Sequence, residues 1–198
     1  MVKGPVTTSP FSAWIRVLRP GNLLIIAASI AVLRWSYSNH IPESGEYFLE
    51  ILFILPLVLL AAGGNIINDY FDIKEDRVNK PERALVGRVL KRRIALVSHW
   101  GLSAAGLFIA GMLSVKINTS IPFVIALIIA IVLFLYSTKF KGSVLFGNVI
   151  VACAVASVVP FAYADSIDTS PPLFQALSLF IWEFGSLMGV IFLIVFIR

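Results

Sequence analysis

The chain carries little charge and almost no cysteine. Only 14% of its 198 residues are charged, 59% are hydrophobic, and the mean hydropathy is +0.92. Soluble domains carry about 25% charged residues, so the composition excludes a soluble globular domain and predicts an integral membrane protein. The single cysteine, Cys153, lies in an apolar run. A disulfide framework and a cysteine-based metal site are therefore both excluded within one chain.

The N-terminus lacks the pattern of a cleavable signal peptide. The stretch "MVKGPVTTSPFSAW" has no basic segment that leads directly into an apolar one. The net charge is +5, which in a soluble protein would suggest a nucleic-acid partner. In a membrane protein basic loops more often set the topology, so no nucleic acid is expected.

Long apolar runs dominate what is present. A membrane-spanning helix needs about 20 mostly apolar residues, and the chain contains six candidates. A short amphipathic segment, Phe11–Leu18, precedes the first. The spans are expected at Leu23–Tyr37, Tyr47–Ile67, Ile94–Val115, Ile121–Tyr136, Leu145–Ala164 and Leu173–Ile197. The predicted fold is an all-α, polytopic membrane helical bundle that forms a single domain over residues 1–198.

The basic residues lie mainly on one side of these spans. Only Arg34 and Lys116 fall on the other side, together with several acidic residues. Eight basic residues lie between the second and third spans: Lys74, Arg77, Lys80, Arg83, Arg88, Lys91, Arg92 and Arg93. The positive-inside rule therefore places the N-terminus and the loops after the second and fourth spans in the cytoplasm.

The acidic residues concentrate in "GGNIINDYFDIKEDRVNKPER", Gly63 to Arg83. If the second helix continues through this stretch, side chains at 100° per residue form one stripe about 100° wide. The stripe contains Asn65, Asn68, Asp69, Asp72 and Asp76. Because stacked carboxylates repel one another, we expect a cation between them.

Oxygen ligands of this kind favour Mg²⁺ or Ca²⁺ over zinc. Mg²⁺ commonly takes one or two carboxylates and completes its shell with waters and substrate phosphates. Three basic residues downstream, Arg77, Lys80 and Arg83, are suited to hold those phosphates. The alternative is a solvated cytoplasmic loop whose charges only fix topology, which is the better interpretation for Arg88 and Lys91–Arg93.

The sequence "NDYFDIKEDRVNKPER" resembles the first aspartate-rich motif of the UbiA superfamily of intramembrane prenyltransferases, N-D-x-x-D-x-x-x-D. The matching residues are Asn68, Asp69, Asp72 and Asp76, followed by Arg77, Asn79, Lys80, Pro81 and Arg83. Two further stretches resemble the family: "RPGN", Arg19–Asn22, and "LYSTKFKGSVLFGNVIVA", Leu135–Ala152. The stretch "AGGNIINDYFD" is most similar to the branch of geranylgeranylglycerol-phosphate geranylgeranyltransferases.

The resemblance implies Mg²⁺-dependent transfer of a prenyl group from a prenyl diphosphate to an acceptor in the membrane, in lipid or quinone-type biosynthesis. It implies metal ligation by Asn68, Asp69, Asp72 and Asp76, with Asn68, Asp72 and Asp76 taking part in catalysis. The implied diphosphate-binding residues are Arg19, Asn22, Asn65, Arg77, Lys80, Arg83, Tyr136 and Lys139. Aromatic acids, quinol precursors and glycerol phosphates stay open as acceptors, and the membrane is expected to be bacterial or archaeal.

The chain departs from the family pattern in two places. The family has nine spanning helices and a second aspartate motif after the sixth, whereas this chain ends at Arg198 after six candidate spans. We therefore expect a prenyltransferase domain that is incomplete at its C-terminus. The family's "RPIPSG" ending of the first motif is replaced by "RALVGR", Arg83–Arg88.

Other functions predict other patterns. A CDP-alcohol phosphotransferase needs a "DG…AR…G…D…D" pattern, which the sequence does not contain. A transporter or cation-binding protein predicts several ionisable residues near mid-membrane, and only Glu183 qualifies. A catalytically inactive fragment stays open as an alternative.

Overall fold

The computed structural model describes residues 9–38, 46–79, 84–141 and 144–167. Within these ranges the regular structure is helical and no strand is present, which confirms the all-α prediction. The elements are α1 (Pro10–Leu18), α2 (Pro20–Ser38), α3 (Tyr47–Phe71), α4 (Ile73–Asn79), α5 (Arg92–Lys116), α6 (Ile121–Leu135), the π-helix η1 (Tyr136–Phe140), α7 (Val144–Ala156) and α8 (Val158–Ala162).

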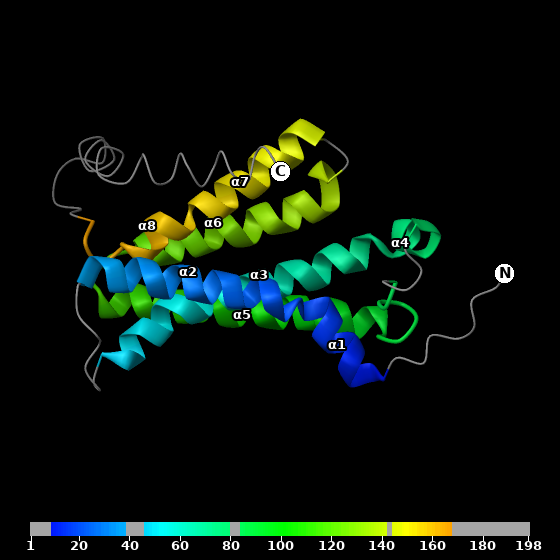
Figure 1. Cartoon of the computed structure of the whole chain (residues 1–198), viewed down its shortest axis with the longest axis horizontal. Helices are drawn as coiled ribbons and strands as arrows, with labels where there is room; N and C mark the ends of the chain where they lie inside the picture. The colour runs from blue at the N-terminus through cyan, green and yellow to red at the C-terminus, as the bar shows by residue number, and fades with distance from the viewer. Residues whose placement is uncertain (1–8, 39–45, 80–83, 142–143, 168–198) are drawn as a thin grey trace.

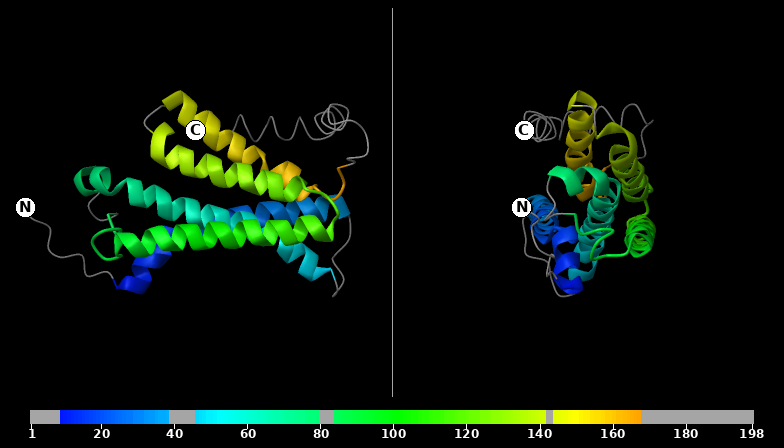
Figure 2. Two further views of the ribbon diagram at one scale, coloured as in Figure 1. Left: turned by 180° about the vertical axis from the view of Figure 1, so that it is seen from behind. Right: turned by 90° about the vertical axis from the view of Figure 1, so that its right-hand side faces the viewer.

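The helices run roughly side by side, so the bundle has two ends (Figure 1). One end, called here the acidic-motif end, contains α1, α4, η1 and the start of α7 (Figures 1 and 2). The opposite end contains α8 and the C-terminal end of α2. Those basic residues of the predicted cytoplasmic side that lie in the described ranges therefore gather toward the acidic-motif end.

In the part of the chain that the structure describes, three helices are long and apolar enough to cross a membrane. They are α3, α5 and the continuous segment Ile121–Phe140, which joins α6 to η1. The pair α1 and α2 passes the same test as one broken span, bent by 42°. These helices correspond to the first four predicted spans, and the sixth, Leu173–Ile197, lies outside the described residues.

The fifth predicted span, Leu145–Ala164, is interrupted. Helix α7 ends at Ala156 and α8 begins at Val158, so no continuous helix of spanning length forms there. The physical reason is Pro160, which has no N–H to donate to the carbonyl four residues earlier. At the break itself, the hydroxyl of Ser157 donates to the Ala154 carbonyl at 2.7 Å.

The second predicted helix also differs from its expected course. Helix α3 ends at Phe71 and α4 begins at Ile73, with a one-residue break at Asp72, whose φ −77° and ψ −2° still lie in the right-handed helical region. The prediction of an uninterrupted helix through Asp76 is therefore wrong. The Asp72 N–H still donates to the Asn68 carbonyl at 3.0 Å, and the Asp76 N–H to the Asp72 carbonyl at 2.8 Å. The chain thus turns at Asp72 without losing its backbone hydrogen bonds, and the aspartate side chain is drawn toward partners on other elements.

Small residues allow α3 to approach α5 closely. A Cβ atom added at Gly106 would lie 3.0 Å from the Pro56 carbonyl oxygen, and one added at Gly63 would lie 3.0 Å from the Ser103 hydroxyl. Next to Gly63, the buried His99 ring places Nδ1 3.0 Å from the Gly63 carbonyl oxygen. This close packing is typical of helices in membranes, and it holds α3 rigidly at the centre of the bundle.

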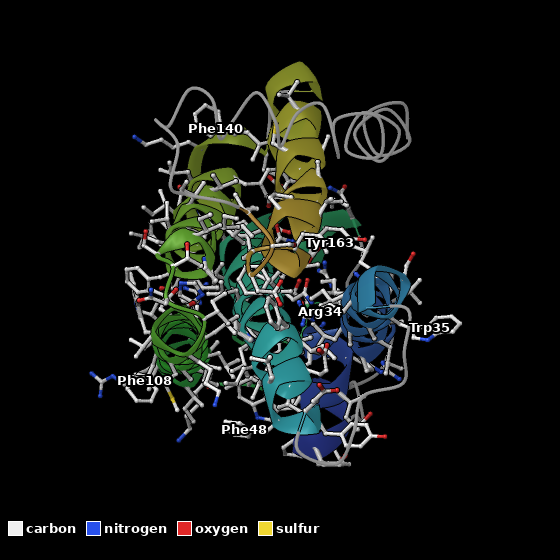
Figure 3. All side chains as sticks on the ribbon, turned by 90° about the vertical axis from the view of Figure 1, so that its left-hand side faces the viewer. Arg34, Trp35, Phe48, Phe108, Phe140 and Tyr163 are labelled. Carbon is white, nitrogen blue, oxygen red and sulfur yellow. The ribbon has the colours of Figure 1, made fainter. Side chains whose placement is uncertain are left out.

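The opposite end is tied together by one buried cation, Arg34. Its guanidinium donates to both carboxylate oxygens of Glu50, at 2.8 and 2.9 Å, and to the Asp165 carboxylate, at 3.0 and 3.1 Å. It also donates to the Ala162 carbonyl at 2.9 Å and lies 3.6 Å from the centroid of the Phe53 ring. Figure 3 shows Arg34 and Tyr163 close together between α2 and α8, while Trp35 and Phe108 point away from the bundle. These bonds join α2, α3 and α8.

Candidate functional site at the acidic-motif end

The two aspartates Asp69 and Asp72 mark the end of α3. Their side chains are only 13% and 10% exposed. Two carboxylates so far from solvent are costly unless each has a partner. Each has one, and both partners come from other parts of the chain.

Arg19 is the partner of Asp69. Its guanidinium donates to the Asp69 carboxylate and forms a salt bridge with it. Arg19 is the single residue between α1 and α2, where the chain adopts a left-handed conformation with φ 54°. Pro20 follows and cannot continue the hydrogen bonding of α1, so the break that positions Arg19 is set locally.

Lys141 is the partner of Asp72. Its ammonium group donates to the Asp72 carboxylate. Lys141 directly follows the π-helix η1, and its N–H donates to the Tyr136 carbonyl at 3.1 Å. Burial lowers the pKa of Lys141 from its ordinary value, the nearby Arg19 charge lowers it further, and Asp69 opposes both effects. Arg19, Asp69, Asp72 and Lys141 therefore form one charged cluster.

Asn68 adds a neutral amide to this cluster. Its Nδ2 group donates to the Asp72 carboxylate at 3.1 Å. Its Oδ1 atom is buried and has no hydrogen-bond partner among the described residues. Such an orphaned acceptor is rare in folded proteins, and it leaves one oxygen beside the carboxylates ready for a cation or a donor.

This oxygen-rich set fits Mg²⁺, which binds through one or two carboxylates and takes its remaining ligands from water and phosphate. Within the described ranges, no three His, Cys, Asp or Glu side chains gather into a metal-binding group. The carboxylates are engaged with Arg19 and Lys141 instead. A set of two carboxylates and one amide oxygen therefore needs the oxygens of a ligand to complete a metal shell.

The remaining predicted site residues lie around the cluster. The Asn65 amide donates to the Leu18 carbonyl at 2.9 Å and so fixes the end of α1 against α3. Arg77 is exposed and donates to the Gly87 carbonyl at 3.4 Å. Asp76 and Tyr136 are partly exposed, and Asn22 and Lys139 are exposed. Lys80 and Arg83 lie outside the described residues.

The sequence indicated Lys139, and not Lys141, as the diphosphate-binding lysine of this region. Both follow the same apolar helix, and no feature of the sequence separates them. The π-helix changes the number of residues per turn, and this decides which lysine faces Asp72. A one-residue widening of a turn has no clear sequence signal, although such segments often occur at functional sites.

The arrangement of the site agrees with the protein family that the sequence matches. The model of the UbiA prenyltransferase family matches residues 23–196. The chain belongs to this family. The resemblance seen in the sequence is thereby confirmed, and the chain is an integral membrane protein.

Curated relatives show which members of the family this chain is similar to. The digeranylgeranylglyceryl phosphate synthase of Thermococcus gammatolerans is 38% identical over 156 residues, which cover 78% of this chain and 53% of the relative. The synthase of Thermococcus kodakarensis is 35% identical over 144 residues, which cover 72% and 48%. The chain thus spans about half the length of the curated relatives it matches.

A solved structure of a digeranylgeranylglyceryl phosphate synthase in membranes is also similar. It superimposes with a TM-score of 0.70 at 27% sequence identity, over 91% of this chain and 60% of that one. The described helices therefore have the arrangement of an intramembrane prenyltransferase.

Proposed function

We propose that the chain takes part in Mg²⁺-dependent transfer of a prenyl group from a prenyl diphosphate to a glyceryl phosphate acceptor. The observation that carries the proposal is the cluster at the end of α3. It pairs two buried carboxylates with two cations and leaves the Asn68 oxygen without a partner. The relatives named digeranylgeranylglyceryl phosphate synthase support the acceptor class.

We assign the metal-holding role to Asn68, Asp69, Asp72 and Asp76, with Asn68, Asp72 and Asp76 as the catalytic residues. When bound there, Mg²⁺ supplies charge neutralisation of the departing diphosphate. Asp69 and Asp72 are suited to this role because they belong to α3 and to the turn directly after it, and Asp76 follows on α4. A preorganised set of charges costs no rearrangement as charge develops in the transition state.

The diphosphate contacts the cations around this set. Arg19 and Lys141 are the nearest, since each already lies beside a carboxylate. In transfer, the bond from the allylic carbon to the diphosphate oxygen breaks, and the electron pair leaves with the diphosphate. The oxygen of the acceptor hydroxyl then bonds to the allylic cation, and the hydroxyl proton passes to the released diphosphate. The proposed diphosphate set also includes Asn22, Asn65, Arg77, Lys80, Arg83, Tyr136 and Lys139.

The acidic-motif end is proposed to face the cytoplasm. All described basic residues except Arg34 and Lys116 lie on α1, α4, η1, the first turn of α5 or the connections beside them, toward this end, which is the positive-inside pattern. The relatives come from archaea, which supports an archaeal type of membrane.

The acceptor is tested by a transfer assay on the chain in lipid nanodiscs. Radiolabelled geranylgeranyl diphosphate and Mg²⁺ are offered with a glyceryl phosphate that carries one geranylgeranyl chain, or with an aromatic acid. We expect label to enter only the glyceryl phosphate product. Labelling of the aromatic acid instead would overturn the acceptor assignment, and labelling of neither would overturn transfer by this chain.

The metal-holding assignment is tested separately by binding. We expect Asp72→Asn and Asp76→Asn to weaken Mg²⁺-dependent binding of prenyl diphosphate, with the larger loss at the buried Asp72, of about 10²-fold. Asp165→Asn, an equal change at the opposite end, is the matched control and leaves affinity unchanged. Unchanged affinity in both motif variants would contradict the assignment.

A further inference from the structure

We propose that Arg19 and Lys141 are removable counter-ions. They neutralise Asp69 and Asp72 while the site is unloaded, and they transfer to the diphosphate when metal and diphosphate arrive together. This inference rests on the proposed function and describes the regulation of the same site. Its consequence is that metal ion alone binds weakly and prenyl diphosphate strengthens metal binding.

The charges of the cluster favour this exchange. Arg19 and Lys141 balance the charges of Asp69 and Asp72, so the proposed metal set keeps one net negative charge, that of Asp76, and a divalent ion that enters alone meets Arg19 and Lys141 as like charges. A prenyl diphosphate brings several negative charges, which give both cations a new partner. Metal and diphosphate therefore each remove the cost of binding the other, and this coupling is reciprocal.

The positions of the four side chains show which can move. The carboxylates are 13% and 10% exposed and belong to α3 and the turn that ends it. The cations are more exposed, at 41% for Arg19 and 33% for Lys141, and both lie in short connections between helices. Long flexible side chains on the rim of the site can change partners while the buried acids stay in place.

The contact geometry agrees with exchange. Among the described residues, each cation makes a single side-chain hydrogen bond to its aspartate, and the Asn68 oxygen beside them is left without a partner. In a permanent structural ion pair, the neighbouring polar atoms are expected to have hydrogen-bond partners. This is the case at Arg34, which donates to Glu50, Asp165 and Ala162. The cluster therefore holds an open coordination position next to bonds that can be replaced.

The test measures binding of Mn²⁺, an ion that substitutes for Mg²⁺ and is detected by electron paramagnetic resonance. The full chain is compared with Lys141→Gln, first with Mn²⁺ alone and then with prenyl diphosphate added. We expect Lys141→Gln to bind Mn²⁺ alone about tenfold more tightly, because the substitution removes the repulsion between the lysine charge and the ion. A tenfold change corresponds to about 1.4 kcal/mol. We expect the same variant to bind prenyl diphosphate about tenfold more weakly in the presence of Mn²⁺.

Lys74→Gln is the matched control, because Lys74 is an exposed lysine at the same end whose charge is screened by solvent. It should change neither affinity. Arg19→Gln is a second test variant with the same two expected changes, and it replaces Lys141→Gln if that variant does not fold.

Two results separate this inference from the proposed function. If Lys141→Gln binds Mn²⁺ alone with unchanged or lower affinity, the counter-ion exchange is overturned. The proposed function still stands in that case, provided that Asp72→Asn abolishes Mn²⁺-dependent diphosphate binding. If Asp72→Asn has no effect on either ligand, the metal site itself is overturned, and the exchange with it.

Discussion

The two ends of the bundle pair their carboxylates with cations in different ways. At the opposite end, one guanidinium serves Glu50, Asp165 and a backbone carbonyl, and it stacks on Phe53. At the acidic-motif end, two aspartates have separate cations, each on the residue that directly follows a helix, and the Asn68 oxygen has no partner among the described residues.

The difference separates a structural tie from a binding site. A guanidinium held by several aligned acceptors has no reason to move, because any movement breaks several charge-assisted bonds at once. A lysine held by one bond loses little when a better anion arrives. The number of bonds per cation thus predicts which charged cluster stabilises the fold and which one takes a ligand.

The largest expected effect is the loss of the structural tie. Arg34→Met leaves the partly exposed Glu50 and Asp165 without their cation and removes bonds to three acceptors, so it should cost about 3 kcal/mol, the lower end of the cost of breaking a buried pair. Thermal unfolding in detergent measures the change. Prenyl diphosphate affinity of the folded fraction should stay the same, and a parallel fall in affinity would show that the two ends are coupled.

A pair of matched neutralisations separates the two ends directly. Glu50→Gln should lower the free energy of unfolding by about 2 kcal/mol, since it removes charge-assisted bonds to Arg34, and should leave ligand affinity unchanged. Asp69→Asn should lower Mg²⁺-dependent prenyl diphosphate affinity about tenfold, or about 1.4 kcal/mol. The free energy of unfolding and the prenyl diphosphate affinity are measured for both variants. If both variants change the same one of these two quantities, the distinction between the two ends is refuted.

A substitution away from both charged clusters provides a reference for a change in packing alone. Gly106→Ala places a methyl group against the Pro56 carbonyl and Leu60, and such overpacking costs about 1–3 kcal/mol. Gly101 has no atom within 4 Å of an added Cβ, so Gly101→Ala is the control and should stabilise by about 0.5–1 kcal/mol. Chemical unfolding of both variants tests this order, and equal stabilities would refute the close approach of α3 and α5.

The smallest effect is expected from a conservative change in the tie. Arg34→Lys keeps the charge and removes the planar fork that reaches both Glu50 oxygens, so it should cost about 1.5 kcal/mol. The same thermal measurement applies. A loss as large as that of Arg34→Met would mean that geometry, and not charge, holds this end together.

The sequence alone determined the helical class, the family and the acidic motif. Apolar runs of spanning length leave few alternatives to helices in a membrane, and the spacing from Asn68 to Asp76 carries the family pattern. Local signals also placed the break at Arg19, because Pro20 ends the hydrogen bonding of α1. These features depend on composition and on neighbours in the chain.

Only the tertiary structure decided which charges meet. Lys141 is separated from Asp72 by 69 positions, and Arg34 from Asp165 by 131, and no local pattern encodes such pairs. The turn at Asp72 and the π-helix before Lys141 shift side chains by part of a helical turn, which periodicity cannot predict. Partners of buried charges are chosen by helix packing in three dimensions, and packing also distinguishes the fixed cation Arg34 from the exchangeable cation proposed at Lys141.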